Sequence, residues 1–154
     1  GTENVPGAVG FARAMELAVA NMPAEAKKLS SLRDRLEKGI LERIPEVAVN
    51  GRGAPRLPGT LNVSFPGVDG EALLMSMDMA GVALSTGSAC SIGEVEPSHV
   101  LLAMGVNPRT AASSLRFSMG WGTNDEGVNH ILEVLPPIVE RLRRVSGGVT
   151  GRTP

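Results

Sequence analysis

Apolar residues at helical spacing predict two helices at the start of the chain. Pro23 is expected to separate them, because proline cannot continue a helix but suits the first turn of a new one. The first helix carries a stripe of apolar side chains: Phe11, Met15, Ala18 and Met22. The second is expected from about Ala24 to Ile44, with its own stripe: Leu29, Leu32, Leu36 and Ile40. Both helices are interpreted as scaffold and not as a site.

Further along, apolar and polar residues alternate, which is typical of strands with one buried face. The alternation is clearest over residues 61–65 and 115–119. Shorter strands are expected over residues 47–49 and 82–84, and the second of these leads directly into residues 85–93. A sheet of short strands is therefore predicted.

Three further helices are predicted between and after the strands. The first spans residues 69–79, and the second runs from Pro97 to about Met104. The last begins at a capping box formed by Thr123 and Glu126 and ends near Arg144. Two prolines inside it, Pro136 and Pro137, predict a kink.

The expected order is α, α, β, β, α, β, loop, α, β, α. Because the connections between strands are short, this order favours a mixed α/β fold of the α+β kind, with a small and mostly antiparallel sheet against which the helices pack. A length of 154 residues fits one domain with a proper core. No internal repeat is present.

Composition narrows the function. The net charge is −1 and aromatic residues make up 3% of the chain, which argues against nucleic acid or an anionic membrane as a partner. No apolar run approaches the roughly 20 residues of a membrane helix. A single cysteine excludes an intrachain disulfide and fits a reducing, cytoplasmic compartment. The start at Gly1-Thr2 suggests the middle of a longer protein.

That single cysteine, Cys90, lies in the run STGSACSIG, residues 85–93. The run is too rich in glycine and serine to form a stable helix or strand. The hypothesis is a nucleophilic thiol on a mobile loop, and a loop cysteine without any role fits the composition equally well.

Two other residues could carry chemistry. Arg116 projects from a predicted strand between small serines, with room for a carboxylate partner, although exposed arginines are usually only solvated. Thr2 precedes a helix and could offer its hydroxyl to an anion, although an ordinary helix cap explains it better. His99 and His130 show no metal-ligand spacing and are interpreted as structural or solvated. Closely spaced methionines are interpreted as core: Met75, Met77 and Met79.

The chain resembles the C-terminal part of a cysteine desulfurase, of the kind that serves nitrogenase and iron–sulfur cluster assembly. The resemblance covers residues 1 to about 144 and rests on four segments: GTENVPG, GEALLMSMDMAGVALSTGSACS, EPSHVLLAMGV and SSLRFSMG. It implies the small C-terminal domain of the aspartate-aminotransferase architecture, in a homodimeric enzyme that uses pyridoxal phosphate. On this basis residues 1–22 would be an interdomain helix region, 23–145 the small domain and 146–154 a flexible tail.

The resemblance also implies roles for the candidate residues. Cys90 would accept sulfur from L-cysteine as a persulfide, and L-alanine would be released. Arg116 would hold the substrate carboxylate, and Thr2 would reach the cofactor phosphate of the second subunit. A sulfur acceptor or iron–sulfur scaffold protein would be the partner. No resident metal is implied, although Cys90 could contact an iron–sulfur cluster transiently.

One departure from the family pattern limits the prediction. The cofactor-binding lysine, histidine and aspartate of such enzymes belong to a large domain that precedes the equivalent of Gly1. The lysines here are expected on one helix, in no matching context: Lys27, Lys28 and Lys38. These 154 residues alone are therefore expected to be inactive. Two alternatives stay open: a stand-alone persulfide relay or interaction module without pyridoxal phosphate, and a sibling transferase acting on another amino acid.

Overall fold

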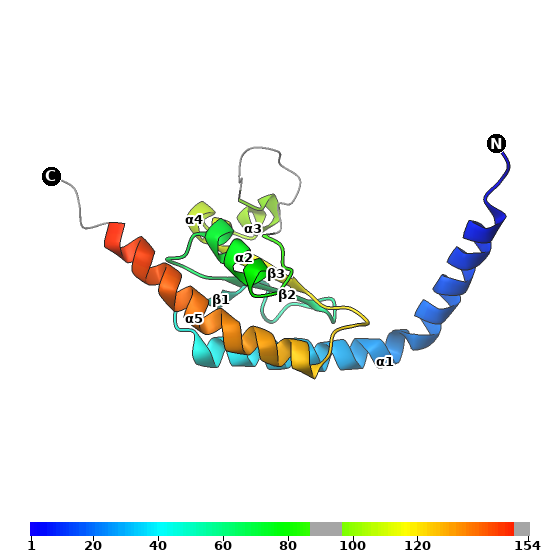
Figure 1. The fold of residues 1–154 in the computed structure, drawn as a ribbon, viewed down its shortest axis with the longest axis horizontal. Coiled ribbons are helices and arrows are strands. Elements are labelled where there is room, and N and C mark those ends of the chain that lie inside the picture. The colour runs from blue at the N-terminus through cyan, green and yellow to red at the C-terminus, as the bar shows by residue number, and fades with distance from the viewer. Residues whose placement is uncertain (87–96, 150–154) are drawn as a thin grey trace.

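The computed structural model describes residues 1–86 and 97–149, and these form a small antiparallel sheet with helices on both sides (Figure 1). In chain order the elements are α1 (Val5–Arg43), β1 (Ala48–Val49), β2 (Thr60–Ser64), α2 (Gly70–Met79), α3 (His99–Ala103), α4 (Pro108–Ala112), β3 (Ser114–Ser118) and α5 (Asp125–Val149). The mixed fold with a small antiparallel sheet is the one expected from the sequence.

The core lies between the sheet and the helices α1, α2 and α5. α1 and α5 run side by side beneath the sheet, and α3 and α4 lie on its other side (Figure 1). Each strand contributes its alternate residues, since neighbouring side chains of a strand point to opposite faces. The largest fully buried side chains include Leu36, Ile40, Leu61, Val63, Phe65, Leu73, Met77, Leu115, Phe117 and Leu135.

The sheet has the order β1-β2-β3, and both pairings are antiparallel. Across β2 and β3 the register places Leu61 opposite Phe117 on the buried face. On the other face the register places Asn62 opposite Arg116. The alternation in the sequence therefore sorts the apolar residues into the core and the polar residues onto the opposite face.

The expected pair of helices at the start of the chain is wrong, because α1 is one helix of 39 residues with Pro23 inside it. A proline removes one backbone donor and pushes away the preceding turn, and a long helix can absorb this by bending. Figure 1 shows such a bend in the N-terminal half of α1. The first half projects from the body as a single helical arm, residues 5–22.

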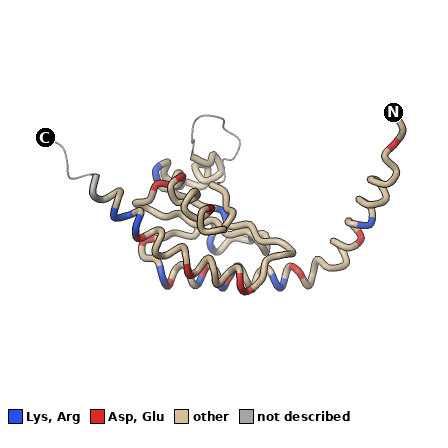
Figure 2. The backbone as a smooth tube through the Cα atoms, in the orientation of Figure 1, with Lys and Arg blue, Asp and Glu red and all other residues tan. Residues whose placement is uncertain are grey.

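The arm exposes apolar side chains that a folded body would normally cover. Phe11 is 69% exposed and Met15 is 53% exposed, as are other apolar side chains of the arm: Val5, Val9, Val19 and Met22. Few charges interrupt this surface (Figure 2).

Three predicted details of the strands and helices are wrong. Residues 82–84 form no strand, and Ser85 alone makes a single bridge to β3. The cap of α5 is Asn124, whose Oδ1 accepts from the Gly127 N–H at 2.9 Å, whereas the Thr123 hydroxyl accepts from Gly120. α5 also continues to Val149, past its expected end near Arg144.

Helix α4 was not predicted from the sequence, and two methionines expected in the core lie outside it. α4 begins with Pro108 after Asn107, whose side chain accepts from the Thr110 N–H at 2.9 Å. An asparagine followed by proline is a standard helix start, so the signal was present. Only Met77 belongs to the core, since Met75 is 66% exposed and Met79 is 88% exposed. Residues two apart cannot share one face of a helix.

We expect Gly70→Ala to lower the free energy of unfolding by about 1–3 kcal/mol. A Cβ at Gly70 would lie 2.1 Å from the Ala112 carbonyl oxygen, which is backbone and cannot rotate away. Gly127→Ala is the matched control, because it also lies in the first turn of a helix but meets nothing closer than 3.5 Å. Urea unfolding of both variants followed by circular dichroism checks this, and equal stabilities would contradict it.

Candidate functional site

Arg116 occupies the middle of β3 with its side chain exposed on the face of the sheet opposite the core. Its backbone is paired on the outer edge of the sheet with Ser85. The Arg116 N–H donates to the Ser85 carbonyl oxygen at 2.6 Å, and the Ser85 N–H donates back at 3.3 Å. The guanidinium Nη2 also lies 3.5 Å from the Ser85 hydroxyl oxygen. Ser85 is thereby fixed beside the guanidinium.

The guanidinium of Arg116 has no carboxylate within ion-pair distance among the described residues. Most other arginines in this part of the chain are bound to acids or to carbonyl oxygens. Glu37 binds both Arg52 and Arg56, for example, and Arg143 donates to three backbone carbonyls. Arg116 is therefore available for an external anion, and a planar guanidinium matches a carboxylate with two parallel hydrogen bonds.

A polar row crosses the sheet at the level of Arg116. It consists of Asn50, Asn62, Arg116 and Ser85, which are neighbours through backbone pairing. The Asn50 side-chain amide donates to Asn62 Oδ1 at 2.6 Å. The alternation of β2 placed Asn62 on the polar face, but only the register shows that it lies opposite Arg116.

Cys90 lies outside the described residues. It follows Ser85 by five positions, so the covalent chain limits the separation of their Cα atoms to about 18 Å. Since Ser85 is paired with Arg116, the segment that carries the thiol starts at the guanidinium. This connection is what the sequence could not reveal.

The structure does not bring Thr2 to Arg116 within this chain. Thr2 is exposed before α1, at the far end of the arm from the sheet (Figure 1). The cap of α1 is Asn4, whose Oδ1 accepts from the Gly7 N–H at 3.0 Å. His130 is structural, because its Nε2 lies 2.8 Å from the Ala80 carbonyl oxygen. The described residues thus join Arg116 with Ser85 and Asn62, and not with Thr2.

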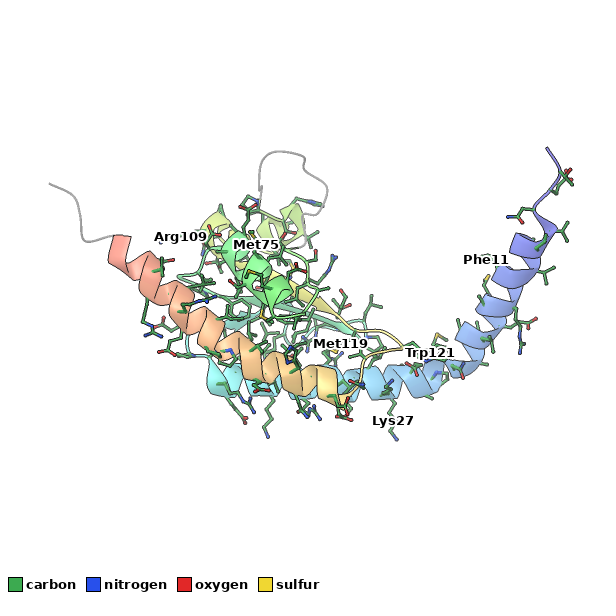
Figure 3. The ribbon with its side chains drawn as sticks, viewed as in Figure 1. Phe11, Lys27, Met75, Arg109, Met119 and Trp121 are labelled. Atoms are coloured by element: carbon green, nitrogen blue, oxygen red, sulfur yellow. The ribbon has the colours of Figure 1, made fainter. Side chains whose placement is uncertain are left out.

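The lysines of this chain do not fit a pyridoxal phosphate site around Arg116. All three lie on α1, which packs against the opposite face of the sheet. Lys27 points away from the sheet (Figure 3), Lys28 donates to the Trp121 carbonyl oxygen at 3.1 Å, and Lys38 lies 3.7 Å from Glu42. Within one chain, these lysines therefore lie on the other side of the sheet from a cofactor that would be bound beside Arg116.

Neither a metal centre nor a membrane span is found in the described residues. No group of three His, Cys, Asp or Glu side chains within 1–86 and 97–149 gathers at a spacing suited to a metal ion. Among the same residues, neither long helix contains an apolar stretch that could cross a bilayer.

Comparison with known proteins identifies the family. The model of the aminotransferase class-V family matches residues 1–131. The chain belongs to the class-V aminotransferases. Among curated members, it is 50% identical over 147 residues to the cysteine desulfurase IscS of Clostridium botulinum and 47% identical over 146 residues to a cysteine desulfurase of Trichormus azollae. These matches cover 94% and 95% of this chain but only 37% and 36% of the relatives.

The solved structures agree with this family assignment. A NifS-like protein from Rickettsia africae superposes with a TM-score of 0.77 at 30% identity, over 91% of this chain and 36% of that one. The expected fold class and the resemblance to desulfurases are both confirmed. The chain spans about a third of the length of these class-V relatives, and Arg116 and Cys90 lie within that third.

We expect the 154-residue chain to form no stoichiometric Schiff base with pyridoxal phosphate, since its lysines lie on the wrong side of the sheet. The measurement is intact mass after borohydride reduction at equimolar cofactor. Replacement of all three lysines by arginine is the control for sporadic surface labelling. A full-occupancy adduct that this replacement abolishes would contradict the expectation.

Proposed function

We propose that this chain forms the C-terminal part of a cysteine desulfurase. The enzyme converts L-cysteine to L-alanine and captures the sulfur as a persulfide on Cys90. One observation carries the proposal: Ser85, at the base of the Cys90 segment, is paired through its backbone with Arg116. The identity of about 50% to proteins named cysteine desulfurase supports the same activity.

Arg116 binds the α-carboxylate of the substrate in this proposal. The exposed guanidinium has no competing acid among the described residues, so two of its N–H groups can donate to one carboxylate. The Cys90 segment begins beside this guanidinium, at Ser85, and in this proposal it brings the thiol to the sulfur of the bound substrate.

Cys90 acts as the sulfur acceptor. Its thiolate attacks the substrate sulfur, an S–S bond forms, and the bond between that sulfur and the β-carbon breaks with its electron pair left on the carbon. Protonation of that carbon leads to alanine. Pyridoxal phosphate would supply the electron sink for C–S cleavage, and it would be held by residues outside this chain.

The remaining residues and partners follow from the same proposal. Residues 1–22 form the interdomain helix region, residues 23–145 form the small domain, and residues 146–154 form a tail. Thr2 contacts the cofactor phosphate of the second subunit of a homodimer. The apolar arm supports this assembly, because surface of this kind is normally buried against protein. A sulfur acceptor, such as an iron–sulfur scaffold protein, takes the persulfide in the cytoplasm.

The position of the lysines favours one alternative, a persulfide relay that receives sulfur from another protein without pyridoxal phosphate. The intact mass of the polypeptide isolated from its source distinguishes the desulfurase from the persulfide relay. A mass near three times that of these 154 residues supports the desulfurase, whose large domain would then be present. A mass near 16.0 kDa supports the relay.

We expect Cys90→Ser in the complete protein to abolish sulfur transfer and to leave cofactor binding unchanged. The serine hydroxyl is far less nucleophilic than a thiolate and cannot hold a persulfide. Sulfide release and the cofactor absorbance are measured side by side. Normal sulfur transfer by the variant would refute the assigned role of Cys90.

We expect Arg116→Ala to raise the KM for L-cysteine about 10- to 100-fold, because the substrate carboxylate loses a charge-assisted pair. Arg109→Ala is the matched control, since Arg109 is an exposed arginine on α4 without an acidic partner in the described chain. The labelled Arg109 lies on the side of the sheet where α4 sits (Figure 3). An equal change of the KM for L-cysteine in both variants would contradict binding of the substrate carboxylate by Arg116.

A further inference from the structure

A chain of hydrogen bonds next to Arg116 has a fixed direction, which can be read from its buried end. The Thr110 carbonyl oxygen can only accept, so the Ser114 hydroxyl must donate its proton to it, at 2.9 Å. Ser64 Oγ lies 2.7 Å from Ser114 Oγ and must then be the donor in that contact. With its proton used, the Ser64 hydroxyl can only accept from Asn50.

The direction continues across the sheet to Asn62. Asn50 must present its amide nitrogen to Ser64 Oγ, which lies 2.8 Å away. The same nitrogen lies 2.6 Å from the Asn62 side chain, so it is the carbonyl oxygen of Asn62 that faces Asn50. The NH₂ group of Asn62 consequently points away from β1. No described residue accepts a hydrogen bond from it.

Backbone pairing brings this free NH₂ group to Arg116. Both hydrogen-bonding groups of the Arg116 backbone are used by Ser85, on the side away from β2. Asn62 and Arg116 are therefore a non-hydrogen-bonded antiparallel pair, in which the Cα atoms approach to about 4.5 Å and the side chains are closest. The Asn62 NH₂ group and the Arg116 guanidinium thus stand side by side on the face opposite the core, and within the described residues neither has a carboxylate partner, the guanidinium having only the Ser85 hydroxyl oxygen at 3.5 Å.

We propose that Asn62 is the second arm of the carboxylate clamp: its side-chain N–H and the Arg116 guanidinium bind the same α-carboxylate, and Asn50 sets the orientation of the Asn62 amide. This inference rests on the proposed desulfurase function, because it takes the amino-acid carboxylate as the ligand. The site selects α-amino acids over the corresponding amines.

The test compares two ligands that differ only in the carboxylate, L-alanine and ethylamine. Binding of each to the complete protein is measured by ligand-observed NMR or calorimetry. We expect Asn62→Ala to weaken L-alanine binding about 10- to 100-fold, the usual range for a hydrogen bond to a charged group, and to leave ethylamine binding within twofold. Asn50→Ala should weaken L-alanine binding by a smaller factor, because the amide of Asn62 loses its orientation but keeps its donor.

Ser118→Ala is the matched control, since Ser118 is exposed on the same strand, two residues from Arg116 and on the same face. It should change neither affinity. Asn62→Asp keeps the shape of the side chain but places a carboxylate opposite the guanidinium. That internal acid should compete selectively with L-alanine, which provides a second test if Asn62→Ala fails to fold.

Two results would refute the proposal that Asn62 and Arg116 bind the same carboxylate. One is unchanged L-alanine affinity in folded Asn62→Ala or in Asn62→Asp. The other is an equal loss for L-alanine and ethylamine, which would mean a merely structural role. Turnover of L-cysteine by the wild-type complete protein separates the two proposals. Turnover with an unaffected Asn62 variant refutes the clamp alone, whereas absence of wild-type turnover refutes the proposed function.

Discussion

The candidate site depends on how the central residue of β3 is paired. A β-residue directs both of its backbone hydrogen-bonding groups to one side, and Arg116 directs them to Ser85. This single choice has two consequences. It attaches the start of the Cys90 segment to the edge of the sheet, and it leaves Arg116 in the close, non-hydrogen-bonded type of pair with Asn62. A shift of the register by one residue would turn the guanidinium into the core.

The two faces of the sheet differ in composition: one packs into the apolar core and the other carries the polar groups of the candidate site. The face toward α1, α2 and α5 holds the buried apolar residues of the strands, including Leu61, Leu115 and Phe117. The opposite face holds the amides, hydroxyls and guanidinium. The two central residues of the polar row, Asn62 and Arg116, lie on strands with the apolar core directly behind them, and positions on strands are defined more closely than positions on loops.

The two halves of α1 differ in what they contribute to the folded body that surrounds the sheet. Helix α1 contributes Leu32, Leu36 and Ile40 to the core in its second half, while the residues of its first half are exposed, Phe11 and Met15 among them. Thr2 lies at the tip of that arm. A site that uses both Thr2 and Arg116 must therefore be completed by other polypeptide, which agrees with a chain that spans about a third of its relatives.

The sequence alone predicted the fold class and the two longer strands, which the structure has at Thr60–Ser64 and Ser114–Ser118, because alternation and motif spacing are local properties. It placed a helix break at Pro23, where the structure has one bent helix, because local propensity does not show how much of a long helix is supported by packing at its far end. It also put the cap of α5 at Thr123 instead of the adjacent Asn124, since either side chain can cap and only the backbone decides. The neighbours of Arg116 were decided by tertiary structure alone. Asn50, Asn62 and Ser85 are distant from Arg116 in the chain, and only strand register brings them into one row.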